Sequence, residues 1–141
     1  MIRFECDYAE GAAPQLLERL TRTNLEQTPG YAVDGHCQRA RDLIRAACAA
    51  PQAEVEFLVG GTQANQTVIS AALRPYQGAL CAQTGHINVH ETGAIEATGH
   101  KVLPLPSQDG KITPKQVEQF CAVHWADPTR EHIVQPGMVY L

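Results

Sequence analysis

The sequence has few charged residues and no run of charges of one sign. Lysine and arginine number 11 and aspartate and glutamate 15, so the formal net charge is −4, and charged residues make up 18% of the chain. Without a basic run, the chain lacks the usual electrostatic signature of a nucleic-acid-binding tail or of a polybasic segment on anionic lipid. We therefore expect neither nucleic acid nor membrane as a partner. The charged fraction, below the roughly 25% of an average domain, is typical of a well-buried or oligomeric surface.

Long hydrophobic runs, a signal-peptide pattern and close cysteine pairs are also missing. The longest apolar candidates, residues 46–50 and 68–73, fall far short of the roughly 18 residues that span a bilayer. The first residues include acidic side chains and a proline where a signal peptide needs a basic patch and an apolar core. The five cysteines are widely spaced, as expected for free thiols in a reducing compartment. We expect a soluble, cytoplasmic chain without a disulfide or zinc framework.

Hydrophobic periodicity predicts helices that alternate with strands. Helices are expected over residues 14–23, 36–50, 62–74, somewhere within 90–98, and 113–125. Strands are expected over residues 54–59, 78–82, 101–105 and 138–141. Asp34 and Thr113 are suited to cap helices, and Pro14 and Pro114 to begin them. This alternation indicates right-handed crossovers and a parallel, helix-covered sheet, so the expected fold class is α/β.

The expected organisation is an N-terminal arm with helices over residues 1–53 and an α/β domain that starts over residues 54–141. Residues 138–141 are typical of a buried strand, yet no crossover follows them. Ligands bind at the carboxyl ends of strands in open α/β sheets, so a chain that stops there lacks a loop that would complete the site. The alternative is a terminal edge strand that needs no such loop.

The segment Gly60-Gly61-Thr62 lies where a predicted strand turns into a helix. Two glycines allow a tight turn, and the free N–H groups of the helix start, with the Thr62 hydroxyl, form a site for an anion such as phosphate. The segment is neither a Walker loop, because Gly-Lys-Ser/Thr is absent, nor a GxGxxG motif. A plain turn with a helix cap is the alternative, and it is the commoner role of such a segment.

The segment GHINVHETGA supplies His86, His90 and Glu91. On a helix the two histidines lie one turn apart and could chelate a metal, but the order is HxxxHE rather than HExxH, and no further Cys/His pair completes a site. An imidazole also stacks on planar ligands or moves protons, and a carboxylate beside it could hold its tautomer. The alternative is that both histidines are hydrogen-bonded surface groups. We expect no metal.

Taken together, these segments resemble a known family. FECDYAEGAAPQLLERL, GYAVDGHCQRARDLI, and FLVGGTQANQT followed by TGHINVHETGA, in this order and spacing, resemble the N-terminal part of the low-specificity threonine aldolase and β-eliminating lyase family. Members are pyridoxal-phosphate enzymes of the aspartate-aminotransferase fold, also called fold type I. The resemblance runs from about Phe4 to Leu141. It implies the N-terminal part of a three-layer α/β/α large domain with a mostly parallel sheet.

The resemblance also implies roles for residues at matching positions. Gly61 and Thr62 correspond to residues that cradle the cofactor phosphate, in agreement with the anion site inferred above. His86 corresponds to the histidine that stacks on the pyridine ring, and Glu91 to an acidic residue near it. These two are the expected catalytic residues.

Two further positions correspond to residues near the substrate. Asp7 matches the aspartate of the opening motif, and Tyr31 matches a tyrosine near the active site that a partner subunit could offer. Cys6 departs from the family, whose members often carry Ser or Asn there. The resemblance therefore does not imply that Cys6 contacts the substrate carboxylate.

The activity implied by the resemblance is carbon–carbon cleavage of β-hydroxy amino acids, such as threonine to glycine plus acetaldehyde, in a homodimer or homotetramer. Pyridoxal phosphate needs a lysine for its Schiff base. Lys101, Lys111 and Lys115 do not match the lysine motif of the family. We therefore expect an N-terminal fragment that is inactive alone. The alternative is a non-catalytic truncated module, or pseudoenzyme, that keeps a phosphate site.

Overall fold

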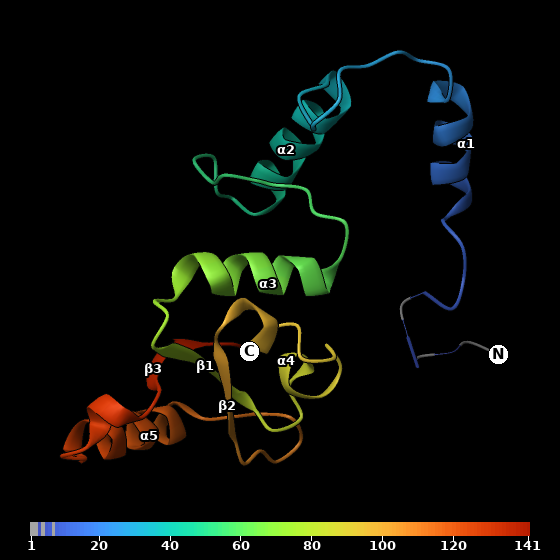
Figure 1. Cartoon of the computed structure of the whole chain (residues 1–141). Helices are drawn as coiled ribbons and strands as arrows, with labels where there is room; N and C mark the ends of the chain where they lie inside the picture. The colour runs from blue at the N-terminus through green and yellow to red at the C-terminus, as the bar shows by residue number, and fades with distance from the viewer. Residues whose placement is uncertain (1–2, 4, 7) are drawn as a thin grey trace. The chain divides into compact units, whose positions relative to one another are not determined.

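The computed structural model describes residues 3, 5–6 and 8–141, and the chain divides into two compact units. The first, residues 1–57, holds helices α1 (Pro14–Thr23) and α2 (Gly35–Ala47), and the second, residues 58–141, holds the sheet and the other helices (Figure 1). In the described part of the chain, no helix has both the length and the apolar character that crossing a membrane requires.

In the first unit, α2 begins where the sequence predicts. The Asp34 carboxylate accepts hydrogen bonds from the backbone N–H groups of His36 and Cys37 at 2.8 and 3.0 Å, which satisfies two of the free donors of the first turn. The helix ends at Ala47 rather than at the predicted residue 50. Ala49 has a φ of 51°, in the left-handed region, and this conformation terminates helices.

The strand predicted over residues 54–59 is wrong, because this segment pairs with no strand of the described chain. Side chains of α2 instead contact the backbone of this segment and of the residue before it. The Arg41 Nε–H donates to the carbonyl of Val55 at 3.0 Å, and the Arg45 Nε–H donates to that of Ala53 at 2.8 Å. A strand exists only as part of a hydrogen-bonded ladder, so apolar composition alone does not produce one.

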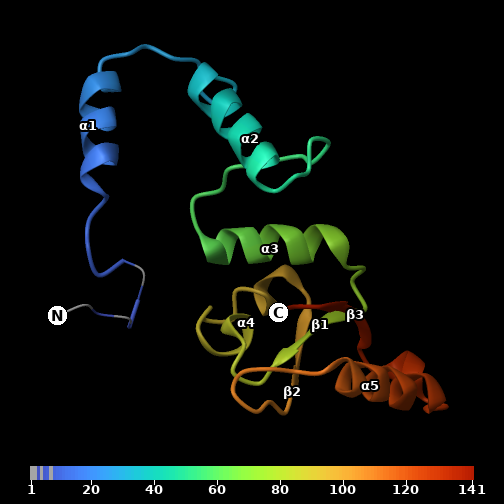
Figure 2. The same ribbon diagram turned by 180° about the vertical axis from the view of Figure 1, so that it is seen from behind.

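The second unit contains a three-stranded parallel sheet in the order β2-β1-β3 (Figures 1 and 2). The strands are β1 (Gln77–Ala82), β2 (Lys101–Leu105) and β3 (Gln135–Val139). The parallel pairing and the intervening helices confirm the α/β class. The last strand begins three residues before residue 138 and ends before Tyr140, although the Tyr140 N–H still donates to the carbonyl of Leu80 at 2.8 Å.

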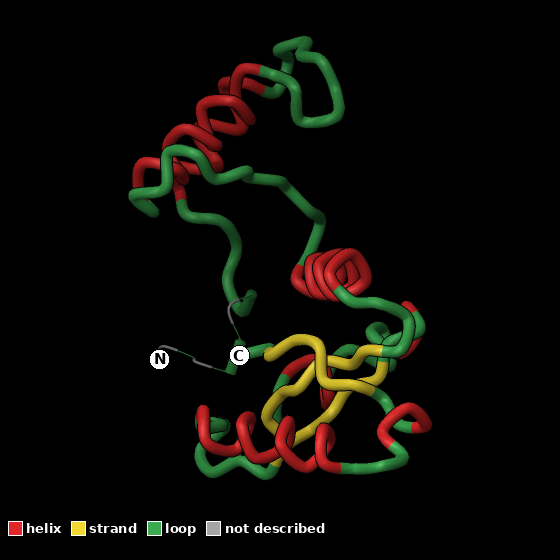
Figure 3. Tube along the Cα trace, turned by 90° about the vertical axis from the view of Figure 1, so that its left-hand side faces the viewer, coloured by secondary structure: helices red, strands yellow, loops and turns green. Residues whose placement is uncertain are grey.

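Helices cover both faces of this sheet. Figure 3 shows α3 (Gly61–Ala72) on one face and α5 (Pro114–Ala126) on the other. The predicted cap of α5 is confirmed, since Thr113 and Gln116 form a reciprocal capping box. Helix α3 ends at Ala72, two residues before the predicted end, where the backbone of Leu73 turns extended.

The helix expected within residues 90–98 does not form as one piece. A single turn, α4 (His86–Val89), precedes that range, and a 3₁₀ turn, Glu96–Thr98, lies inside it. Between them Thr92 and Gly93 have φ values of 56° and 74°, which no continuous right-handed helix accommodates. The chain reverses there and places Glu91 in the interior.

The apolar core lies between α3 and the sheet. Its members come from α3, the strands and the segment after β1: Ile69, Leu73, Ala79, Cys81, Ile87, Ile95 and Val102. Burial in this core raises the pKa of the Cys81 thiol. The core therefore fixes α3 and the His86 segment against the same face of the sheet.

Candidate functional site

The N-terminus of α3 is open and unobstructed. Gly60 precedes the helix, and Gly61 and Thr62 form its first turn, all three exposed. A Cβ added at either glycine would meet nothing within 4 Å, so the space beside this backbone is free. The first N–H groups of an α-helix have no partners within the helix and carry the positive end of its dipole. The predicted anion site therefore has the required local geometry.

His86 begins α4, just after the carboxyl end of β1, and pairs with Glu91. The His86 Nδ1 lies 2.8 Å from the Glu91 Oε1. The imidazole is 57% exposed, whereas the Glu91 side chain is completely buried. An ionised carboxylate only accepts hydrogen bonds, so the proton of the neutral ring is held on Nδ1 and the lone pair on Nε2. The exposed His86 ring therefore has a defined tautomer, with its proton on Nδ1.

Asn65 connects this pair to α3. Its Nδ2 lies 2.5 Å from the Glu91 Oε1 and 3.3 Å from the Tyr140 hydroxyl. Asn65 is four residues after Gly61, one helical turn along the same helix. The structure therefore brings Gly61, Thr62, His86 and Glu91 into one region, near the carboxyl ends of β1 and β3.

A second contact joins the same two segments. The Gln66 Nε2 donates to the backbone carbonyl of Ala94 at 3.0 Å, and Ala94 closes a turn by donating its N–H to the carbonyl of Glu91. The loop that carries Glu91 is thus held against α3 by a side chain and by its own backbone. The site is therefore formed by a helix and by a loop that is hydrogen-bonded to that helix.

The Glu91 carboxylate carries an unsatisfied oxygen. Its Oε2 is buried and has no hydrogen-bond partner in the described part of the chain. A buried carboxylate oxygen without a donor is costly, and native proteins satisfy nearly all such groups. A bound molecule with a hydrogen-bond donor would remove this cost.

The remaining predicted site residues are not brought to this region by the second unit. Tyr31 belongs to the first unit, where it is fully exposed with a φ of 62°, an uncommon conformation for a bulky residue. Asp7 lies outside the described residues. The His90 ring centroid is 5.5 Å from that of His86, but no group of three His, Cys, Asp or Glu suited to a metal occurs among the residues that the structure describes.

The three lysines are exposed. Lys101 begins β2, whereas His86 follows the end of β1. Because the two strands are parallel, these residues lie at opposite ends of the strands. Lys101 is therefore not placed to react with a molecule that contacts His86.

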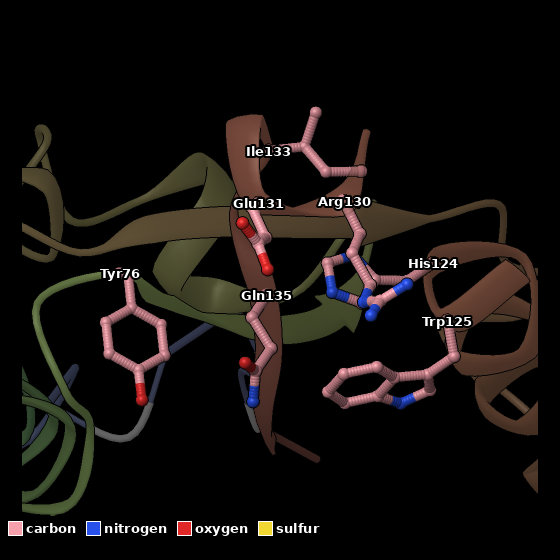
Figure 4. Close-up of a pocket in the computed structure, with 7 residues that line it drawn as sticks. All are labelled: Tyr76, His124, Trp125, Arg130, Glu131, Ile133 and Gln135. Carbon is pink, nitrogen blue, oxygen red and sulfur yellow. The ribbon is translucent and has the colours of Figure 1, made fainter. Parts of the chain in front are cut away.

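A cavity of about 540 Å³ lies at the opposite ends of the strands from His86 (Figure 4). Its lining is Tyr76, His124, Trp125, Arg130, Glu131, Ile133 and Gln135. Tyr76 precedes β1 and Gln135 begins β3, so the cavity is at the amino ends of the parallel strands. It contains none of the predicted site residues.

Sequence reasoning missed Asn65 and Tyr140. A signal existed for Asn65, because it lies one helical turn after Gly61 and shares that side of the helix. No local pattern marks Tyr140, whose contact with Asn65 spans 75 residues of sequence.

The chain is similar to proteins of one family along nearly its whole length. Residues 6–141 match the family model described as beta-eliminating lyase. Two curated relatives, both described as low specificity L-threonine aldolase, are 29% identical (a Pseudomonas species) and 27% identical (Pseudomonas aeruginosa). Each alignment covers 98% of this chain and 42% of the relative.

A solved structure gives the same result. A threonine aldolase from Leishmania major is 44% identical and superposes with a TM-score of 0.88, over 96% of this chain and 38% of its own. The chain thus spans about two-fifths of the length of the relatives that it matches.

Proposed function

The chain belongs to the β-eliminating lyase family, and from this premise we propose that it carries the phosphate-binding part of a pyridoxal-phosphate enzyme that cleaves β-hydroxy amino acids. The proposed reaction is that of a threonine aldolase, which converts threonine to glycine and acetaldehyde. The observation that carries the proposal is the juxtaposition of the open α3 N-terminus with the His86–Glu91 pair, linked through Asn65.

The residues present fit the cofactor. The free N–H groups of α3 suit a phosphate, and the exposed His86 ring suits a flat aromatic surface. The buried Glu91 Oε2, which has no partner among the described residues, can also accept a hydrogen bond from a further donor. When bound, pyridoxal phosphate supplies an electron sink for the pair left on Cα as the Cα–Cβ bond breaks.

In this proposal Gly61 and Thr62 would bind the cofactor phosphate and orient the cofactor. The first N–H groups of α3 and the Thr62 hydroxyl donate hydrogen bonds to phosphate oxygens, and the positive end of the helix dipole favours the negative charge. The missing Cβ of Gly61 leaves room for that approach. Helix α3 thereby fixes one end of the cofactor relative to His86.

His86 and Glu91 hold the catalytic proton. With its Nδ1–H directed at Glu91, His86 presents Nε2 as an acceptor for a proton from the substrate. The buried carboxylate then stabilises the imidazolium that forms. We propose that Asp7 and Tyr31 contact the substrate, and that the complete protein is a cytoplasmic homodimer or homotetramer in which a partner subunit offers Tyr31.

We further propose that these 141 residues lack the lysine that anchors the cofactor and are inactive alone. Two observations support this. Lys101 lies at the amino end of β2, away from His86, and the chain covers 42% of the length of a threonine aldolase that it matches. The test adds pyridoxal phosphate to the chain, treats it with borohydride, maps any lysine adduct by peptide mass spectrometry, and assays threonine cleavage. We expect cofactor retention with neither adduct nor cleavage.

An adduct at Lys101, Lys111 or Lys115 accompanied by threonine turnover would contradict this account, because it would reveal a complete small enzyme. The non-catalytic alternative is tested by mixing the chain with the C-terminal portion of a relative. Recovery of threonine cleavage in the mixture supports the enzyme. Cofactor retention without any recovery supports the phosphate-binding module.

A further inference from the structure

We propose that Asn65 is a positioning residue that sets the tautomer of His86 through Glu91, and that the Tyr140 hydroxyl supports Asn65 in this role. The inference rests on the proposed role of His86 beside the cofactor. Its geometry is formed by side chains of this chain alone.

Asn65 and His86 both contact one oxygen of the Glu91 carboxylate. This one oxygen is contacted both by His86 Nδ1 at 2.8 Å and by Asn65 Nδ2 at 2.5 Å, while Oε2 has no partner in the described chain. Without Asn65 the Glu91 side chain keeps only its contact with His86, and it can change rotamer so that neither carboxylate oxygen stays against Nδ1. The amide donor therefore holds the carboxylate where it accepts the proton of His86 Nδ1.

Tyr140 fixes which end of the Asn65 amide faces Glu91. An amide has a donor end and an acceptor end, and only the NH₂ end can stabilise a carboxylate. The Asn65 Nδ2 also lies 3.3 Å from the Tyr140 hydroxyl, which can accept its second N–H. Tyr140 is itself tied to the sheet by its backbone bond to Leu80, so it provides a fixed acceptor that keeps the NH₂ end turned toward Glu91.

Two segments far apart in sequence are coupled by this arrangement. Asn65 lies on the helix whose first turn forms the proposed phosphate site, and Tyr140 follows β3. A network that fixes helix, loop and strand end together preorganises the His86 ring. Loss of either support would let the ring exchange between tautomers.

The test is nitrogen NMR of the imidazoles in the full chain without cofactor, at a pH of about 9, where free imidazole is neutral. Shifts of the two ring nitrogens report which one carries the proton, and the His86 signals are identified by their loss in His86→Gln. In the unsubstituted chain we expect the Nδ1-protonated form alone. In Asn65→Ala we expect averaged nitrogen shifts from both tautomers, and in Tyr140→Phe a smaller change of the same sign.

Gln66→Ala is the matched control, because Gln66 anchors the same loop through a backbone carbonyl and does not touch Glu91. We expect this variant to keep the original nitrogen shifts. Should Asn65→Ala not fold, Asn65→Leu replaces it with a side chain of similar volume that makes no hydrogen bonds, and the same change is expected.

Unchanged His86 shifts in the folded Asn65 variant, or equal changes in Gln66→Ala, would overturn the inference. Either result leaves the proposed function intact if the chain still retains pyridoxal phosphate. Conversely, a tautomer that depends on Asn65 in a chain that does not retain the cofactor would support the positioning role and contradict the proposed function. The two failures are therefore distinguishable.

Discussion

At the scale of single residues, short-range hydrogen bonds cap the first turns of α2 and α5. Asp34 accepts from two backbone N–H groups at the start of α2, and Thr113 forms the corresponding bond at the start of α5. A hydrogen bond from the Cys37 side chain, with those from the backbone, lowers the pKa of Asp34 to about 2, from an ordinary value of 3.8. Asp127 shows the same effect, since the Thr129 hydroxyl lowers the pKa of its carboxyl.

Asp34 makes the start of α2 sensitive to acid. Because its folded-state pKa is depressed, its contribution to stability is complete above about pH 4 and is lost as the pH falls toward 2. The protection of the His36 and Cys37 amides, measured as their exchange rate relative to an unstructured peptide at the same pH, should therefore fall over that range. Replacement by alanine should lower this protection at neutral pH as well.

The matched control is Asp34→Asn, which keeps a side-chain oxygen that caps the helix but cannot be protonated in this range. Its amide protection at neutral pH should stay near that of the unsubstituted chain. Between pH 4 and 2 the acid-dependent loss of protection should be absent. Identical pH profiles for the two chains would show that another group is responsible.

The reach of each contact determines which site residues the sequence could predict. The caps of α2 and α5 were predictable because donor and acceptor are two or three residues apart. The Asn65 contacts with Glu91 and Tyr140 span 26 and 75 residues, and no local pattern encodes them. The anion site and the His86 segment could therefore be anticipated, but the network that joins them could not.

At the scale of elements, α3 and the sheet are the parts that position the site. One face of α3 contributes Ile69, which is 1% exposed, to the core, while the next residue toward the N-terminus, Val68, is 56% exposed. Alternation along the strands sends Ala79 and Cys81 toward the same core. The packing that holds α3 is thus concentrated in a few residues.

Ile69→Ala should destabilise the second unit by about 2–5 kcal/mol, because it removes buried methyl groups and leaves a cavity. Val68→Ala removes a similar side chain from the exposed face and should change the stability by no more than about 0.5 kcal/mol. Urea denaturation followed by circular dichroism measures both. Equal losses in the two variants would contradict the assigned orientation of α3.

Strands were predicted correctly where a segment with a suitable sequence pattern also has a neighbouring strand to pair with. Residues 101–105 were predicted as a strand and form β2 with the same bounds, since β1 lies beside them. Residues 54–59 have an equally suitable composition, but no strand of the described chain pairs with them, and the Arg41 side chain donates to the Val55 carbonyl. Periodicity reports what an element can bury, whereas strand formation depends on a distant partner.

At the scale of the whole molecule, the sheet has an edge with consequences for solution behaviour. In the described chain β3 pairs with β1 on one side only, and Val139 on this strand is 42% exposed. Unpaired edges with apolar side chains promote association between chains. The chain should therefore be poorly soluble and self-associate as its concentration rises.

Val139→Lys should reduce this association, because a lysine on an edge strand opposes pairing with another chain. Val123→Lys adds the same charge on the exposed surface of α5 and is the matched control. Sedimentation velocity over a range of concentrations compares the three proteins. Association reduced equally by both substitutions would indicate a general charge effect and not pairing at the β3 edge.

The central claim, that α3 begins with a phosphate site for the cofactor, is tested most directly by comparing pyridoxal phosphate with pyridoxal in equilibrium dialysis. We predict that the chain binds pyridoxal phosphate, that pyridoxal binds far more weakly, and that Thr62→Val weakens pyridoxal phosphate about tenfold or more by removing a hydrogen bond to a charged group. Thr67→Val is the control, because the exposed Thr67 hydroxyl donates to the carbonyl of Gln63 on the same helix, and the affinity of this variant for pyridoxal phosphate should be unchanged. Equal binding of the two ligands, or equal affinities in the two threonine variants, would contradict the account.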